Sequence, residues 1–144
     1  EQHRHFAAKL GLSDSTVIPG RVPDAYACLR HADIYTLPSI EEGSGSVSLL
    51  EAMQVGVAPV VSRVDGLPED VADGESALLT APGDTADLAR ALRRLVEDAE
   101  LRARLARGAQ ARYRERFSAA AFAADIGAVY SGLGFAPAAR PLAA

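Results

Sequence analysis

The sequence predicts an α/β fold in which a parallel sheet is covered by helices on both faces. Short apolar runs alternate with helical patterns along the first 81 residues. The strand candidates at 58–62 and 76–81 are continuously apolar, which is typical of strands buried on both faces. A length of 144 residues suits one domain with one core. Together these observations indicate a single sheet with crossover helices.

The expected strands follow the short apolar runs. We expect four of them, at 15–20, 33–39, 58–62 and 76–81. Helices are predicted between them at 22–32, with Pro23 near the start, and at 46–56, where Gly56 ends the helix. The loop 63–75 is rich in turn residues and is predicted to hold one helical turn near Pro68.

Helical patterns dominate both ends of the chain. Residues 5–12 resemble the end of a helix stopped by Gly11, and three helices are expected at 84–98, 99–117 and 118–133. Asp84 and Ser118 are the candidate caps. The first of these three helices has an apolar face formed by Leu88, Leu92, Leu95 and Val96. Residues 134–144 are expected to form a flexible tail after a domain that spans 1–133.

Composition excludes several classes of function. The formal net charge of −4 gives no electrostatic attraction for nucleic acid or an anionic membrane. The single cysteine, Cys28, rules out an internal disulfide, and its apolar neighbours predict an inert buried thiol. No stretch approaches the roughly 20 apolar residues of a membrane span, and the polar, charged start leads us to expect no signal peptide. We therefore expect a cytoplasmic protein, whose parent could also act at the inner face of a membrane.

The loop 39–46 is the candidate ligand site, because ligands of parallel sheets bind outside the carboxyl ends of the strands. Gly43 and Gly45 allow close approach of the backbone, and the helix start that follows offers free N–H groups to an anion. The helix carries Glu51, an acceptor able to hold two vicinal hydroxyls. Plainer interpretations stay open: for Glu51, a capping box with Ser48 or a place on a solvated helix face, and for Glu41 with Glu42, a charged loop.

A set of motifs in this region resembles a known family. The segments are ADIYTLPSIEEGSGSVSLLEAMQVGVAPVVS and DGLPEDVADGESALLTAPGD. They look like the C-terminal, donor-binding domain of retaining nucleotide-sugar glycosyltransferases of the GT-B class, family four. The resemblance covers most of the chain and implies a Rossmann-like half of a GT-B fold, incomplete at its N-terminal end because the first strand–helix unit is absent.

The resemblance also implies roles for individual residues. Glu51 corresponds to the glutamate that holds the donor ribose, and Glu42, or less favourably Glu41, to the catalytic-site glutamate that meets hydroxyls of the transferred sugar. The loop facing the sugar and diphosphate corresponds to Gly43, Ser44, Gly45, Ser46 and Val47. Gly20 and Arg21 correspond to the turn beside the nucleobase. Two features depart from the family pattern: eight residues rather than seven separate Glu42 from Glu51, and Ser44 stands where a Phe is common.

The function implied is transfer of a sugar from a nucleoside diphosphate to an acceptor hydroxyl, without a bound metal or other cofactor. The implied partners are a nucleotide sugar and an N-terminal acceptor domain that this chain lacks, so the isolated chain is expected to be inactive. Without that domain, Phe122, Ile126 and Val129 would be exposed and could drive self-association. The alternative is a non-catalytic Rossmann-like binding or assembly module. An acidic cluster at Asp65, Glu69, Asp70 and Asp73 is expected to be a solvated loop rather than a Mg²⁺ site.

Overall fold

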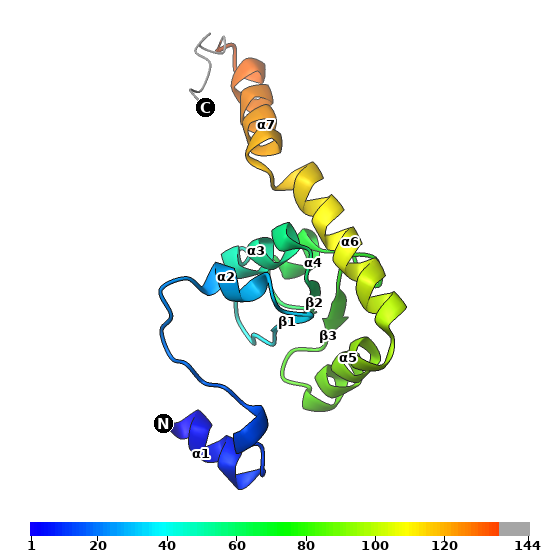
Figure 1. Ribbon diagram of the computed structural model, residues 1–144. Coiled ribbons are helices and arrows are strands. Elements are labelled where there is room, and N and C mark those ends of the chain that lie inside the picture. The colour runs from blue at the N-terminus through cyan, green and yellow to red at the C-terminus, as the bar shows by residue number, and fades with distance from the viewer. Residues whose placement is uncertain (136–144) are drawn as a thin grey trace.

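The computed structural model describes residues 1–135, and a three-stranded parallel sheet forms its centre (Figure 1). The strands are β1 (Ile34–Leu37), β2 (Ala58–Ser62) and β3 (Leu78–Thr80), in the order β1-β2-β3. Ile34 pairs with Ala58 and Val60 pairs with Leu78. All five residues of β2 are buried, which confirms the prediction of a strand covered on both faces.

Helices pack on both faces of this sheet. One core cluster joins β2 to α3 (Val47–Val55), α4 (Leu67–Asp70) and α6 (Ala99–Arg116); its buried members are Leu49, Met53, Val61, Leu67, Val71, Ala77 and Ala109. The second joins β2 and β3 to α5 (Thr85–Glu97) and α6; its buried members are Ala58, Val60, Leu78, Ala91, Leu95, Leu101 and Leu105. Neighbouring residues of β2 thus point to opposite faces, as strand geometry requires.

Caps set the helix boundaries as the sequence predicts. The carboxylate of Asp84 accepts from the N–H groups of Ala86 and Asp87, both at 2.9 Å. The hydroxyl of Ser118 accepts from the N–H of Ala121 at 3.2 Å and begins α7 (Ala119–Gly132). Gly56 ends α3 in the left-handed region at φ 76°. The predicted helical turn near Pro68 is α4.

The prediction of a strand at 15–20 is wrong. The chain forms α1 (Gln2–Lys9) and a 3₁₀ turn, η1 (Ser13–Ser15), and then runs without a sheet partner to α2 (Ala25–Leu29). Figure 1 shows this connection passing outside the sheet. Val17 is 87% exposed, so the segment gains neither ladder hydrogen bonds nor burial. α2 is shorter than the predicted 22–32, and its later start follows from Asp24, which caps it by accepting from the N–H of Ala27 at 2.9 Å.

Two burial predictions are also wrong. Cys28 is exposed, because the short α2 leaves it on an uncovered face. Val96 is 67% exposed, whereas Leu95 beside it is fully buried, so the apolar face of α5 turns away from Val96.

The last helix leaves the body of the molecule. α7 packs against the end of α6 and projects away from the sheet (Figure 1). It buries no residue, and Phe122, Ile126 and Val129 are exposed as predicted. Of the predicted tail 134–144, residues 136–144 lie outside the described part of the chain, while Phe135 contacts the ring of Tyr130 edge-on. Within residues 1–135, no helix is long and apolar enough to cross a membrane.

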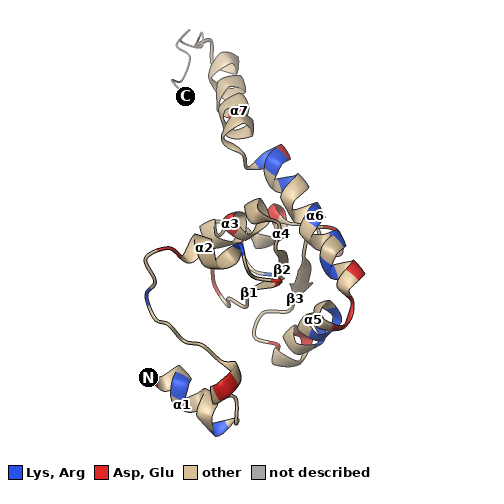
Figure 2. Ribbon diagram, in the orientation of Figure 1, with Lys and Arg blue, Asp and Glu red and all other residues tan. Residues whose placement is uncertain are grey.

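A series of arginines runs along α6 (Figure 2). Two of them cap the carbonyl end of α4. Nε of Arg112 donates to the carbonyl of Asp70 at 2.6 Å, and Arg116 donates to the carbonyl of Glu69 at 3.1 Å. These bonds satisfy carbonyls that a short helix leaves unpaired, so Arg112 and Arg116 stabilise the fold.

Candidate functional site

The loop between β1 and α3 holds the predicted glutamates in different environments. Glu41 is exposed. Glu42 is half-buried, and its carboxylate accepts a hydrogen bond from the hydroxyl of Ser39 at 2.5 Å. Both glutamates lie in a loop, and Glu42 differs from Glu41 in having a side-chain partner within it.

Gly45 lies where the loop packs against α4. Its φ is 143°, and a Cβ at this position would lie 2.9 Å from Oδ2 of Asp70. Only glycine fits this conformation without strain. Burial raises the pKa of Asp70, although the guanidinium groups of Arg116 and Arg112 oppose that shift. The glycine thus brings the loop backbone against a carboxyl group that the sequence did not single out for this site.

A hydroxyl network connects β1 to the start of α3. The hydroxyls of Tyr35 and Ser48 lie 2.7 Å apart, and those of Ser48 and Ser46 lie 3.0 Å apart. Ser46 occupies the N-cap position, whereas Ser48 is already inside the helix. The capping-box interpretation of Ser48 with Glu51 is therefore wrong, because the hydroxyl of Ser48 bonds to Tyr35 instead.

The pKa of Tyr35 reflects its burial and the charges near it. Burial, as the main cause, raises the pKa of the Tyr35 hydroxyl, and the charges of Glu42 and Glu51 raise it further, against the hydrogen bonds with Ser48 and Ser46. A carboxylate exerts this effect only from nearby. Glu51 itself is half-buried on α3. The fold thus places Glu42 in the loop before α3 and Glu51 within α3, where their oxygens can accept hydrogen bonds from a polyhydroxyl ligand.

Asp65 adds a contact that sequence reasoning missed. Its Oδ2 accepts from the N–H of Glu42 at 2.7 Å and from the N–H of Gly43 at 3.0 Å. These two hydrogen bonds lower the pKa of the Asp65 carboxyl. The Asp-Gly turn after β2 is visible in the sequence, but its pairing with a loop more than 20 residues away is not.

Gly20 and Arg21 are not brought to this cluster. They lie in the irregular connection between η1 and α2, outside the sheet (Figure 1). Arg21 is exposed, and no hydrogen bond found among residues 1–135 joins either residue to the glycine loop. The sheet lacks the strand predicted just before them, so nothing fixes their distance from Glu51.

Two carboxylates of the acidic cluster, those of Asp65 and Asp73, bind separate partners. Asp73 pairs with Arg63 at 3.0 Å and accepts from the N–H of Leu79, while Asp65 accepts the two loop amides. In the part of the chain that the structure describes, no three His, Cys, Asp or Glu side chains form a group suited to a metal ion.

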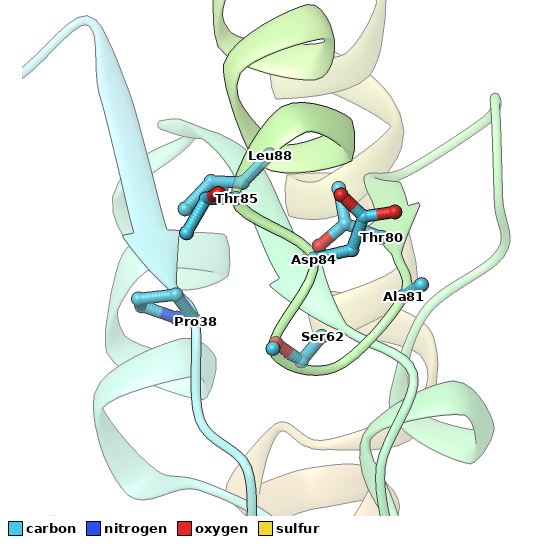
Figure 3. A pocket seen from close by; sticks show the side chains of 8 residues that line it. Pro38, Ser62, Thr80, Ala81, Asp84, Thr85 and Leu88 are labelled. Carbon is cyan, nitrogen blue, oxygen red and sulfur yellow. The ribbon is translucent and has the colours of Figure 1, made fainter.

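A small hollow opens at the same edge of the sheet but on the α5 side (Figure 3). Its volume is about 80 Å³, and it is lined by residues at the ends of all three strands and at the start of α5: Pro38, Ser62, Thr80, Ala81, Gly83, Asp84, Thr85 and Leu88. Sites for drug-sized ligands are usually roughly 300–1,000 Å³. None of the predicted site residues lines this hollow, so it is separate from the cluster around Tyr35.

Comparison with known proteins identifies the family. Residues 1–112 match the family described as "Glycosyl transferases group 1". The chain belongs to this family. A D-inositol 3-phosphate glycosyltransferase of Corynebacterium efficiens is 36% identical over 133 residues, which cover 91% of this chain and 31% of that protein. The protein of the same name from Streptomyces bingchenggensis is 40% identical over 133 residues, which cover 88% of this chain and 28% of that protein. The chain thus spans about a third of the length of these group 1 relatives.

Solved structures place the chain in the same fold. Anabaena HepE in complex with UDP superposes with a TM-score of 0.83 at 26% identity, over 91% of this chain and 36% of HepE. A sucrose-phosphate synthase from Thermosynechococcus elongatus superposes with a TM-score of 0.81 at 26% identity, over 92% of this chain and 34% of the synthase. These matches confirm the Rossmann-like, GT-B type of fold predicted for this group 1 chain, present here as a partial domain.

Proposed function

We propose that this chain is the donor-binding part of a retaining glycosyltransferase that moves a sugar from a nucleoside diphosphate to an acceptor hydroxyl. Its family and the GT-B fold support this assignment. Related structures carry UDP and UDP-glucose, according to the descriptions of HepE. The relatives named D-inositol 3-phosphate glycosyltransferase act, by that name, on a hydroxylated acceptor.

The observation that carries the proposal is the anchoring of Glu42 in the loop before the helix that holds Glu51: its N–H donates to Asp65, and its carboxylate accepts from Ser39. Two carboxylates on one polar cluster give several acceptors for a ligand with vicinal hydroxyls. In the proposed arrangement Glu51 accepts from the ribose hydroxyls, and Glu42 accepts from hydroxyls of the transferred sugar. Ser39 holds the carboxylate of Glu42 in one orientation for that contact.

The diphosphate would lie at the glycine loop. Residues 43–47 lead into α3, whose first N–H groups have no partner within the helix and carry a partial positive charge. Negative charge develops on the diphosphate as it leaves, and fixed N–H donors stabilise it without reorganisation. No metal is required in this scheme, because these donors, aided by an Arg and a Lys of a preceding strand–helix unit in the intact protein, would neutralise the leaving group.

Acceptor binding and the catalytic step are assigned to a further domain. The chain spans about a third of its relatives, so we assign to it donor binding without transfer. In the intact protein an N-terminal domain would supply the acceptor site, and the reaction would take place in the cytoplasm.

The experiment that tests this proposal is calorimetric titration of the chain with UDP, UDP-glucose, GDP and GDP-mannose. We expect binding of at least one of these donors or nucleotides, and its loss in Glu51→Ala. Glu115→Ala, which removes an exposed carboxylate at the far end of α6, is the matched control and should bind like the wild type. Absence of binding to all four compounds would overturn the assignment, as would equal binding by Glu51→Ala.

Self-association through α7 is a second proposed property. Phe122, Ile126 and Val129 are 64%, 40% and 60% exposed, and they recur at helical spacing on one side of α7. Asp125 is the one charged residue of this helix. A second copy of the chain would cover these side chains when the acceptor domain is absent.

A further inference from the structure

Asp65 has a backbone conformation that its residue type rarely adopts. Its φ is 45°, and among residues 1–135 it is the one non-glycine residue with a positive φ. Asp and Asn tolerate this left-handed region better than other side chains, but the conformation still costs free energy. Such strain persists when the surrounding structure determines it. The hydrogen bonds of the Asp65 side chain hold the residue in this conformation.

The carboxylate of Asp65 binds the backbone of the candidate site. One oxygen, Oδ2, accepts from the N–H of Glu42 at 2.7 Å and from the N–H of Gly43 at 3.0 Å. Hydrogen bonds to an ionised acceptor are shorter and stronger than neutral ones. Both bonds favour the charged form and so lower the pKa of Asp65. The carboxylate is therefore ionised at neutral pH while it holds the loop.

Gly66 joins the same contact through its backbone. Its N–H donates to the carbonyl of Gly43 at 3.2 Å. A Cβ on residue 66 would lie 2.4 Å from the carbonyl oxygen of Ser44, which is closer than any real contact. The Asp65–Gly66 turn after β2 thus lies directly on the backbone of residues 42–44, and we name this contact the 65–66 clasp.

The clasp fixes Glu42 from its main chain, while Ser39 fixes it from its side chain. The N–H of Glu42 bonds to Asp65, and its carboxylate accepts from Ser39. A carboxylate that must meet a sugar hydroxyl gains from such preorganisation, because less freedom is lost on binding.

We propose that the ionised carboxylate of Asp65 is a positioning residue for donor binding: it holds Glu42 and Gly43 in the conformation in which they contact the sugar. Asp65 acts through the loop backbone and touches no reacting atom. This role rests on the proposed donor-binding function.

The test compares three variants at residue 65 by titration with UDP-glucose and GDP-mannose. Asp65→Ala removes the acceptor and should weaken binding of the accepted donor about tenfold, as expected for the loss of charge-assisted hydrogen bonds in an exposed loop. Asp65→Gly removes the acceptor but also the strain, and should be weakened to the same degree. Asp65→Asn keeps one neutral acceptor oxygen and should recover part of the affinity. Asp14→Ala, at an exposed acid of η1, is the control.

A second readout needs no ligand. Amide proton shifts of Glu42 and Gly43 should titrate together, at a midpoint below the ordinary pKa of Asp, and this titration should disappear in Asp65→Asn. Glu42→Gln, which removes the neighbouring carboxyl, should leave it in place. Hydrogen exchange at both amides should accelerate in Asp65→Ala.

The outcomes separate the two proposals. If the wild type binds a donor and Asp65→Ala or Asp65→Gly binds it equally well, the positioning role is wrong and the donor-binding function stands. If the wild type binds none of UDP, GDP, UDP-glucose and GDP-mannose, the donor-binding function fails and the positioning role fails with it, whatever the amides report. If it binds UDP or GDP but neither sugar donor, the positioning role alone is wrong. Amides that do not titrate with Asp65 would overturn the clasp itself.

Discussion

Tyr35 joins the first strand of the sheet to the helix that follows the glycine loop. Its hydroxyl lies 2.7 Å from that of Ser48, and burial is the main cause that raises its pKa, with smaller contributions in the same direction from the charges of Glu42 and Glu51. A tyrosine in this position stays protonated and can donate a hydrogen bond, either to Ser48 or to a ligand. The sequence indicated only a strand residue here, because nothing in the pattern of a single strand shows which helix will cover it.

Replacing Tyr35 with Phe tests the hydroxyl network. The variant keeps the ring and loses the bond to Ser48, so we expect the free energy of unfolding to fall by about 0.5–1.5 kcal/mol. Urea denaturation of the two proteins measures the difference. Tyr130→Phe, at a 54% exposed ring of α7, is the control and should leave stability unchanged. An unchanged stability for Tyr35→Phe would show that the network contributes nothing.

The raised pKa of Tyr35 gives a pH dependence with a defined sign. The folded protein holds this proton more tightly than the unfolded chain, so the contribution to stability is complete below the unfolded value of 10.0 and is lost as the pH rises through the folded pKa. We expect the stability difference between wild type and Tyr35→Phe to shrink above about pH 10. A difference that grows with pH in this range would contradict the burial of the neutral hydroxyl.

At the scale of elements, α6 requires a glycine where it crosses the loop before β3. A Cβ on Gly108 would lie 2.1 Å from the carbonyl oxygen of Glu75. Gly to Ala in a helix interior is normally stabilising by about 0.5–1 kcal/mol. Here we expect Gly108→Ala to lower the free energy of unfolding by about 1–3 kcal/mol, because the backbone of residue 75 cannot move away without displacing β3.

Gly127 of α7 provides the matched control. It is also inside a helix, but no atom lies within 4 Å of the Cβ position. Gly127→Ala should therefore raise the helix content measured by circular dichroism and should not destabilise the sheet. If both substitutions have the same effect, close packing of α6 is not what selects glycine at 108.

The exposed face of α7 predicts self-association of the chain. Replacing Phe122 and Val129 together with Gln removes apolar area while keeping residues that form helices well. We expect the wild type to show a mass that increases with concentration in light scattering and the double variant to stay monomeric. A wild type that is monomeric at every concentration tested would contradict the proposed interface.

Local signals predicted some elements well and failed at others for a physical reason. Asp84, Ser118 and Gly56 mark helix ends by bonds or conformations that involve only neighbouring residues, so these boundaries could be read from the sequence. The run at 15–20 has a strand-like composition, but a strand also needs a neighbour, which composition cannot supply. The burial predictions for Cys28 and Val96 were wrong for a similar reason, because burial depends on what covers a short helix or the edge of a helix.

At the scale of the whole molecule, the order of strands and helices was predictable and the contacts between distant loops were not. The parallel sheet with helices on both faces follows from alternation and from apolar runs such as 58–62. Glu42, Gly45 and Glu51 could be selected because their residue types suit sugar and phosphate ligands. Asp65 bonds to Glu42, and Tyr35 bonds to Ser48 of the same helix as Glu51, through contacts between segments remote in sequence that only coordinates show.

The most direct measurement of the central claim is an amide chemical-shift map of the isotope-labelled chain titrated with UDP-glucose and GDP-mannose. The claim predicts that one of these donors shifts the amides of residues 42–48, of Glu51 and of Tyr35. It also predicts that α5 and the face of α6 lined by Ala103 and Arg107 stay unchanged. Shifts confined to those helices, or the same shifts in Glu51→Ala, would contradict it.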